Sequence, residues 1–176
     1  ADKTIFTGYT DFKAEAKVLA IVNADGESVD MLGAGEKGAV VLDKTPFYAT
    51  SGGQVADTGV IVSDGVEAVV DDTTKNADGV YLHSCTVKSG VISVGNTVTA
   101  SIDADRRKAI MRNHTAAHLL QAALREVLGT HVEQAGQLVN EKEVRFDFTH
   151  FNPMTEDELK RVEQIVNANI LSCDCV

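Results

Sequence analysis

The sequence lacks several features that would place the protein at a membrane or outside the cell. Its apolar runs all fall short of the ~20 residues that a membrane-spanning helix requires. The N-terminal residues Ala1–Thr4 do not have the layout of a signal peptide. The three cysteines, Cys85, Cys173 and Cys175, are an odd number, and the last two are too close together for a usual zinc knuckle. We therefore expect a cytoplasmic protein with free thiols and no membrane partner.

Positive charge and aromatic residues are also scarce. The chain has 16 Lys and Arg against 26 Asp and Glu, a formal net charge of −10, and only 5% aromatic residues. This composition argues against an autonomous RNA-binding module. The local exception is the basic group Arg106, Arg107, Lys108 and Arg112. It has two interpretations, a solvated helix face or a set of phosphate contacts.

The chain of 176 residues, 44% of them hydrophobic, is long enough to bury a substantial core. Its first part contains short runs rich in β-branched residues, separated by turn sequences. These expected strands are Val18–Val22, Ser28–Leu32, Ala39–Leu42, Val55–Val62, Val66–Val70, Val80–Val87 and Val91–Ile102. Their even spacing predicts a small antiparallel β-barrel domain over residues 1–102.

Residues 103–176 show a different pattern, which predicts a helix, two strands and a second helix. The first helix is expected over Asp103–Leu128, with Asp103 as N-cap and a glycine after its end. Strands are expected at Glu133–Val139 and Glu143–Thr149. A capping-box pattern at Thr155 then opens the last helix. The expected fold class is α+β, with a barrel domain followed by an α/β half.

Two histidines, His114 and His118, lie four residues apart in the first expected helix. Residues at i and i+4 project from the same helix face, so the two imidazoles are spaced to bind one metal ion. The same spacing also occurs in ordinary helices whose histidines belong to a core, and both interpretations stay open. Zinc-protease chemistry is excluded, because Thr115 stands where that motif requires glutamate.

A glycine-rich segment, Thr45–Gly59, interrupts the expected strands. The consecutive residues Gly52 and Gly53 permit positive φ and the close approach of another backbone or a ligand, and polar residues such as Gln54 and Thr58 surround them. A phosphate-binding loop would require a lysine and a following helix, which are both missing. By itself, the segment is a turn with polar side chains.

Four motifs occur in order along the chain, and together they resemble a known family. The sequence is similar to the editing region of bacterial alanyl-tRNA synthetases, which is shared with free-standing alanyl-tRNA editing proteins. The matching stretches run from Lys44 onward and are Pro46–Gly59, Arg112–Leu120, Val127–Val132 and Arg145–His150.

The resemblance implies a β-barrel followed by an α/β half related to the editing domain of threonyl-tRNA synthetase. It also implies a zinc ion, with His114 and His118 as ligands and as catalytic residues. The family's other zinc ligands, a Cys and a His of a later Cys-x-x-x-His motif, have no match before Val176. We therefore expect a C-terminally truncated fragment that is inactive in isolation. Thr50 also departs from the acidic residue that is common in the family.

The resemblance further implies that the site hydrolyses the ester of tRNA(Ala) mischarged with serine or glycine. The full-length family members bind ATP and ligate alanine to tRNA. We expect Gly52, Gly53, Gln54 and Thr58 to bind the substrate, and Gln134 to be a third catalytic residue near the aminoacyl end. The basic residues Arg106, Arg107, Lys108 and Arg112 are expected to contact the tRNA, beside the rest of the synthetase chain. The alternative is a non-catalytic tRNA-binding or structural module of a larger synthetase.

Overall fold

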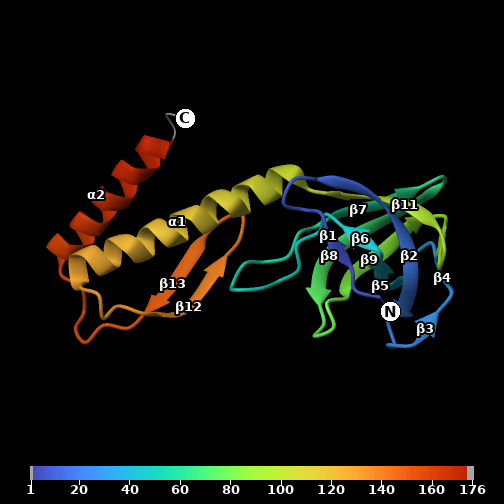
Figure 1. The fold of residues 1–176 in the computed structure, drawn as a ribbon, viewed down its shortest axis with the longest axis horizontal. Helices are drawn as coiled ribbons and strands as arrows, with labels where there is room; N and C mark the ends of the chain where they lie inside the picture. Colours follow the sequence, from blue (N-terminus) through green and yellow to red (C-terminus); the bar gives the residue numbers. More distant parts are fainter. Residues whose placement is uncertain (1, 174–176) are drawn as a thin grey trace. The chain divides into compact units, whose positions relative to one another are not determined.

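The computed structural model describes residues 2–173 and has the expected α+β fold (Figure 1). The chain forms two compact units. The first contains the residues up to Ser51 together with Ala56–Arg107, and the second contains Gly52–Val55 together with the residues from Lys108 onward. The short segment Gly52–Val55 therefore belongs with the histidine helix, although its neighbours on both sides belong to the first unit.

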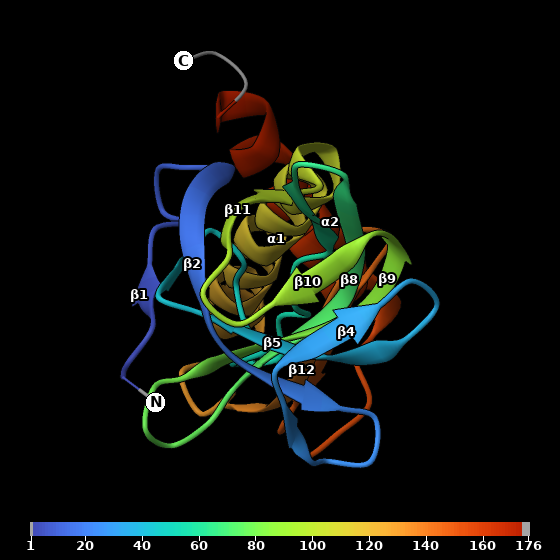
Figure 2. The ribbon, with the colours of Figure 1, turned by 90° about the vertical axis from the view of Figure 1, so that its right-hand side faces the viewer.

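The first unit is a closed antiparallel β-barrel of six strands, as the sequence predicts. Each strand is hydrogen-bonded to the next, and the last, β11, pairs again with β2, so that the sheet curls back on itself (Figure 2). The order around the barrel is β2 (Lys13–Asn23), β5 (Lys37–Leu42), β9 (Tyr81–Ser89), β8 (Val66–Lys75), β7 (Gly59–Ser63) and β11 (Thr97–Ile102). Closure leaves no long unpaired edge within these six strands.

Short strands complete the first unit. The strand β3 (Ser28–Val29) extends the sheet beside β2, β4 (Met31–Gly33) pairs with β10 (Val91–Ser93), and β1 (Ile5–Phe6) runs parallel to β6 (Lys44–Thr45).

The strand predicted at Val55–Val62 is wrong in its first four residues, because β7 begins only at Gly59. The backbone of Gly53, Gln54 and Val55 instead pairs with Val139 of the second unit's hairpin. The strand predicted at Val91–Ile102 is interrupted by a turn at Gly95, whose φ is +90°.

The barrel encloses one hydrophobic core, to which every strand of the closed sheet contributes. Its fully buried side chains include Val18, Ile21, Val40, Leu42, Ile61, Val70, Val87 and Val98. Cys85 also lies in this core as a free thiol, and burial raises its pKa to about 11. The prediction of a free thiol is therefore confirmed for Cys85. The same prediction for Cys173 and Cys175 concerns side chains that the structure does not describe.

One histidine is completely buried in the barrel. His83 on β9 lies with Nδ1 2.8 Å from the carbonyl oxygen of Val40 and Nε2 2.7 Å from Oγ1 of Thr45. A neutral ring with its proton on Nδ1 satisfies both contacts, because it donates to Val40 and accepts from Thr45. Burial lowers the pKa of His83 from 6.5 to about 4. The folded barrel therefore holds this imidazole in its neutral form at physiological pH.

The first prediction concerns stability against pH. The unfolded chain binds a proton at His83 below pH 6.5, whereas the folded chain does so only near pH 4. Stability should therefore fall as the pH drops from 6.5 to 4, by up to about 3 kcal/mol at ~1.4 kcal/mol per pH unit. Urea unfolding at several pH values measures this slope. In the variant His83→Gln, most of this dependence of stability on pH should disappear. An unchanged slope in that variant would show that His83 is not its source.

The second unit has the predicted order of helix, two strands and helix. The elements are α1 (Ala104–Leu128), whose first turn belongs to the first unit, β12 (Gln134–Val139), β13 (Val144–Phe148) and α2 (Glu156–Cys173). Asp103 caps α1, because its Oδ1 accepts a hydrogen bond from the backbone N–H of Arg106. Gly129 follows with φ +119°, and the capping box of Thr155 and Glu158 is present at α2.

Two apolar clusters hold α1 against the antiparallel hairpin β12–β13 (Figure 1). The first is formed by Ile110, Ala117 and Val139 with Val55 and Val144. The second contains Ala123, Leu124, Val132 and Val162, with surrounding side chains from α1, β13 and α2. No helix in residues 2–173 is long and apolar enough to cross a membrane.

Candidate functional site

The two histidines of α1 lie side by side on the second unit. The ring centroids of His114 and His118 are 4.9 Å apart, and the ring planes differ by 16°. His118 is exposed and His114 is half-buried. Partial burial and the neighbouring His118 lower the pKa of His114. His114 is therefore neutral at physiological pH, which is the form of imidazole that binds metals.

The glycine-rich segment supplies a partner for the first histidine. Nδ1 of His114 is 2.5 Å from Oε1 of Gln54, whose side chain is only 8% exposed. A neutral ring that donates Nδ1–H to this amide oxygen keeps its lone pair on Nε2. A buried acceptor on one ring nitrogen fixes both the tautomer and the orientation of a metal-binding histidine. The amide of Gln54 therefore holds His114 with Nε2 free to bind.

Close backbone approach puts Gln54 in this place. The N–H of Val139 donates to the carbonyl of Gly53 (2.9 Å), and the N–H of Val55 donates to the carbonyl of Val139 (3.1 Å). Gly53 has φ +81°, and a Cβ there would collide with the carbonyl oxygen of Gln137. Both the conformation and the contact require glycine at this position.

A second prediction tests this packing. The substitution Gly53→Ala adds a methyl group against the Gln137 carbonyl at a positive φ, which should destabilise the second unit by roughly 1–3 kcal/mol. Gly65→Ala is the matched control, since its φ is also positive (+71°) but nothing lies within 4 Å of its added Cβ. Thermal or urea unfolding compares the two. Equal losses in both variants would show that backbone strain alone, and not the contact with Gln137, accounts for the effect.

The histidine pair fits zinc as two of its ligands. Zinc binds neutral imidazole nitrogen at ~2.0–2.1 Å. Both rings project from the same face of α1. Among residues 2–173, however, no set of three or more His, Cys, Asp and Glu side chains is placed to hold a metal ion. The described part of the chain therefore offers two of the three or four protein ligands that zinc sites use.

The other predicted substrate residues differ in their exposure and in their hydrogen bonds. Gln134 is exposed at the start of β12, opposite Phe148, and none of the hydrogen bonds in the described chain joins its side chain to a histidine. Thr58 belongs to the first unit and is half-buried, and its carbonyl accepts a hydrogen bond from Asp103 (2.7 Å). Gly52 is exposed, with its carbonyl bound by Nε2 of Gln137 (3.2 Å).

The four basic residues have different environments. Lys108 and Arg112 are exposed, and Arg106 is half-buried with Nη1 bound to the carbonyl of Ala56 (2.7 Å). Arg107 is buried in the first unit, and its guanidinium pairs with the carboxylate of Asp57.

Arg107 also donates to the carbonyls of Gly8 (2.7 Å) and Pro46 (2.9 Å). Its hydrogen-bonding capacity is used inside the barrel unit, which leaves little to offer a phosphate. We therefore leave Arg107 out of the residues that we propose to contact tRNA.

Sequence reasoning did not find two contacts of the second unit. It assigned Gln54 to substrate and gave His114 no partner. The second contact joins His131 and His150, with Nε2 of His131 2.9 Å from Nδ1 of His150. Both contacts join residues from separate elements, so no local spacing reveals them.

Comparison with known proteins gives the class of the chain. The family model of class II (A) tRNA synthetases matches residues 1–106. The chain therefore belongs to the class II (A) tRNA synthetase family. The match covers most of the barrel unit and ends before His114, so the histidine helix lies outside it.

Full-length relatives extend the similarity across both units. The chain is 50% identical over 171 residues to the alanine–tRNA ligase of Rhodopseudomonas palustris, and 52% identical over 169 residues to that of Dechloromonas aromatica. The enzyme of the same name from Bacillus cytotoxicus is 50% identical over 165 residues. These alignments cover 97%, 96% and 94% of the chain but 19% of each relative. The chain thus spans about a fifth of the length of the curated relatives it matches.

Proposed function

We propose that this chain is part of a longer alanine–tRNA ligase and carries part of a site that edits tRNA. The reaction is hydrolysis of the ester that joins serine or glycine to tRNA(Ala). The observation that carries the proposal is the contact of Gln54 with His114, which orients the imidazole of His114 beside that of His118 on one helix face. The similarity to alanine–tRNA ligases over nearly the whole chain supports it. This role places the protein in the cytoplasm, where tRNA is charged.

Each residue of the pair has a role in this proposal. His114 and His118 hold zinc through ring nitrogens, with the remaining Cys and His ligands supplied from outside the described residues. The chemistry that bound zinc supplies is polarisation of an ester carbonyl or a lowered pKa of water, to ~7. Gln54 keeps the Nδ1 proton of His114 in place, so that the opposite nitrogen stays unprotonated.

Contact with the tRNA is assigned to Lys108, Arg112 and the side chain of Arg106. Lys108 and Arg112 are exposed on α1, the helix that carries the histidines. Their contacts would be electrostatic, and each phosphate neutralised contributes ~0.7–0.9 to the slope of log affinity against log salt. Because the whole chain carries a net charge of −10, we expect this contact to be weak at physiological salt in the isolated chain.

Selectivity for serine over alanine follows from the serine hydroxyl. A pocket that pairs with this hydroxyl leaves its own polar groups unsatisfied when alanine is bound, so that the correct product is spared. We assign this pairing to Gln134, whose side chain is exposed, and we treat Thr58, a residue of the first unit, as a separate candidate. Gln54 is a weaker candidate than the sequence alone suggests, because its Oε1 is engaged by His114.

A third prediction separates serine from glycine. In the full-length protein, Gln134→Ala should slow hydrolysis of seryl-tRNA(Ala) several-fold and hydrolysis of glycyl-tRNA(Ala) much less, because glycine has no hydroxyl. The expected loss corresponds to one hydrogen bond of about 0.5–1.5 kcal/mol. Thr58→Val tests the second residue in the same way. If hydrolysis of both substrates slowed equally, these residues would support the structure of the site and would not recognise the serine hydroxyl.

The experiment that tests the proposed function is a deacylation assay. Purified full-length protein is mixed with seryl-tRNA(Ala), glycyl-tRNA(Ala) and alanyl-tRNA(Ala), and release of each amino acid is followed. We expect the first two esters to be hydrolysed faster than alanyl-tRNA(Ala). Binding of tRNA without hydrolysis of the mischarged forms would favour the alternative, a non-catalytic tRNA-binding or structural module.

A further inference from the structure

One face of the barrel unit gathers aromatic rings that the editing reaction does not use. Phe6 on β1 contacts three tyrosines, with centroid distances of 4.9 Å to Tyr9, 6.3 Å to Tyr48 and 6.0 Å to Tyr81. The rings of Phe6 and Tyr81 are nearly parallel, at 4°. Tyr9 is 90% exposed. We call Phe6, Tyr9, Tyr48 and Tyr81 the aromatic cluster.

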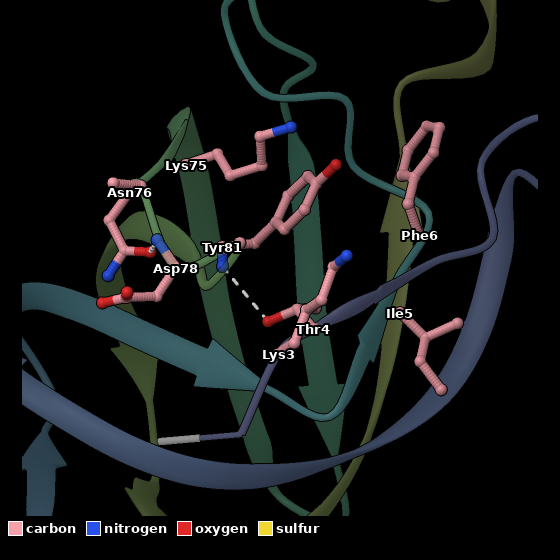
Figure 3. Close-up of a pocket in the computed structure, with 10 residues that line it drawn as sticks. Lys3, Thr4, Ile5, Phe6, Lys75, Asn76, Asp78 and Tyr81 are labelled. Carbon is pink, nitrogen blue, oxygen red and sulfur yellow. Dashed lines mark hydrogen bonds between the residues drawn. The ribbon is translucent and has the colours of Figure 1, made fainter.

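A pocket of about 600 Å³ opens beside the aromatic cluster (Figure 3). It is lined by β1, the end of β8, the turn that follows and the start of β9. The backbone N–H of Tyr81 donates to Oγ1 of Thr4, which fixes the N-terminal segment against β9 (3.1 Å). The hydroxyl of Thr4 in turn donates to the carbonyl of Leu42 (3.0 Å). The wall of the pocket is therefore tied to the barrel.

Positive charge is concentrated in this pocket. Its charged lining residues are Lys3, Lys75 and Asp78, two cations against one anion in a chain with a net charge of −10. The ammonium group of Lys75 lies 5.8 Å from the centroid of Tyr81, and Figure 3 shows the Tyr81 ring between Lys75 and Phe6. The aliphatic part of the Lys3 side chain lies against Gly79: a Cβ built at Gly79 would be 3.0 Å from Cγ of Lys3.

Within residues 2–173, neither Lys3 nor Lys75 forms a salt bridge with a described carboxylate. The two ammonium groups are thus available to a ligand anion. Proteins bind single-stranded nucleic acid by stacking its bases on aromatic rings and by contacting its phosphates with basic side chains. The aromatic cluster and the two lysines provide both kinds of group.

We propose that the aromatic cluster with Lys3 and Lys75 binds an unpaired stretch of RNA. A base stacks on the exposed ring of Tyr9 or beside Phe6 and Tyr81, and the lysines contact the adjoining phosphates. Stacking tolerates any base, because every base has a π face, so the site discriminates single strands from duplexes rather than one sequence from another. The contact is independent of the histidine pair and does not rest on the editing reaction.

The composition of the chain provides a direct probe. The chain has no tryptophan, and its three tyrosines all belong to the aromatic cluster. The intrinsic tyrosine fluorescence of the 176-residue chain therefore reports on this face alone. A base that stacks on these rings should quench it.

The experiment titrates the chain with a single-stranded hexamer of adenylate, and with a hexamer of uridylate, at 50 mM and 200 mM salt. We expect quenching by both, and weaker binding at the higher salt. Anisotropy of labelled RNA gives the affinity independently of the tyrosines. Tyr9→Ala, at an exposed position, should weaken binding by about five- to a hundredfold. Lys3→Gln and Lys75→Gln should each weaken RNA binding. Each should also reduce the slope of log affinity against log salt by the contribution of about one phosphate contact.

Lys88→Gln is the matched control, because Lys88 is an exposed lysine of β9 outside the pocket. The proposal is overturned if neither hexamer quenches the fluorescence, if duplex RNA binds as well as the single strand, or if Lys88→Gln weakens binding as much as Lys75→Gln. Adenosine monophosphate that binds as tightly as the hexamer would also overturn it, in favour of a free nucleotide. Loss of deacylation in the full-length protein bears only on the editing proposal, so the two proposals fail separately.

Discussion

In the full-length protein, His114→Ala is expected to lower kcat/KM for hydrolysis of both seryl-tRNA(Ala) and glycyl-tRNA(Ala) by at least about 100-fold. The factor corresponds to a barrier higher by ~2.7 kcal/mol. The two substrates should suffer alike, because the imidazole acts on the ester and not on the side chain that distinguishes them. The contact between Nδ1 and the buried amide of Gln54 shows that the ring is held in one orientation, which a methyl group cannot replace. Single-turnover deacylation measures the loss.

Thr115→Ala is the control for this prediction. Thr115 follows His114 on α1, is exposed, and donates its hydroxyl only to the carbonyl of Met111 (3.1 Å). Its removal should leave hydrolysis within a factor of two or so, since exposed substitutions rarely cost more than ~0.5 kcal/mol. If the His114→Ala variant hydrolysed both esters at the original rate, His114 would have no role in the reaction.

Arg107→Met is expected to destabilise the protein by about 3–5 kcal/mol. The substitution leaves the carboxylate of Asp57 buried without its partner, and it deprives the carbonyls of Gly8 and Pro46 of their donor. The side chains of Arg107 and Asp57 are only 7% and 3% exposed, so water cannot replace the guanidinium. Removing one partner of a buried pair costs this much because an uncompensated charge remains. Urea unfolding of the chain measures the difference.

Arg145→Ala provides the contrast. Arg145 also pairs with an aspartate, Asp147, at 3.4 Å, but these side chains are 67% and 50% exposed. Exposed pairs contribute ~0–1 kcal/mol, because both charges remain hydrated when separated. If the two arginine variants lost similar stability, the buried network around Arg107 would not have the importance assigned to it.

The fold was largely predictable from the sequence because local signals agreed with one another. The β-branched runs and their turns indicated the barrel, and α1 was found through Asp103 at its start and Gly129 at its end, both of which the structure confirms. The apolar side chains of α1 pack in two clusters with the hairpin and α2. These features depend on neighbours in sequence.

The site was less predictable, because its contacts join distant residues. The sequence places Gln54 and His114 60 positions apart, and nothing local shows that Gly52–Val55 leaves the barrel to pair with β12. Arg107 misleads for the same reason: a run of basic residues reads as a solvated face, while its buried partner, Asp57, is 50 positions away.

The most direct test of the account is a double-mutant cycle on Gln54 and His114, measured as single-turnover hydrolysis of seryl-tRNA(Ala) by the full-length protein. If Gln54 acts by orienting His114, Gln54→Ala lowers the rate about 10–100-fold when His114 is present, as loss of a metal ligand's partner does. The same substitution has little further effect in the His114→Ala background. An equal fall in both backgrounds, or no fall in either, would contradict the proposal that Gln54 positions His114 for the reaction.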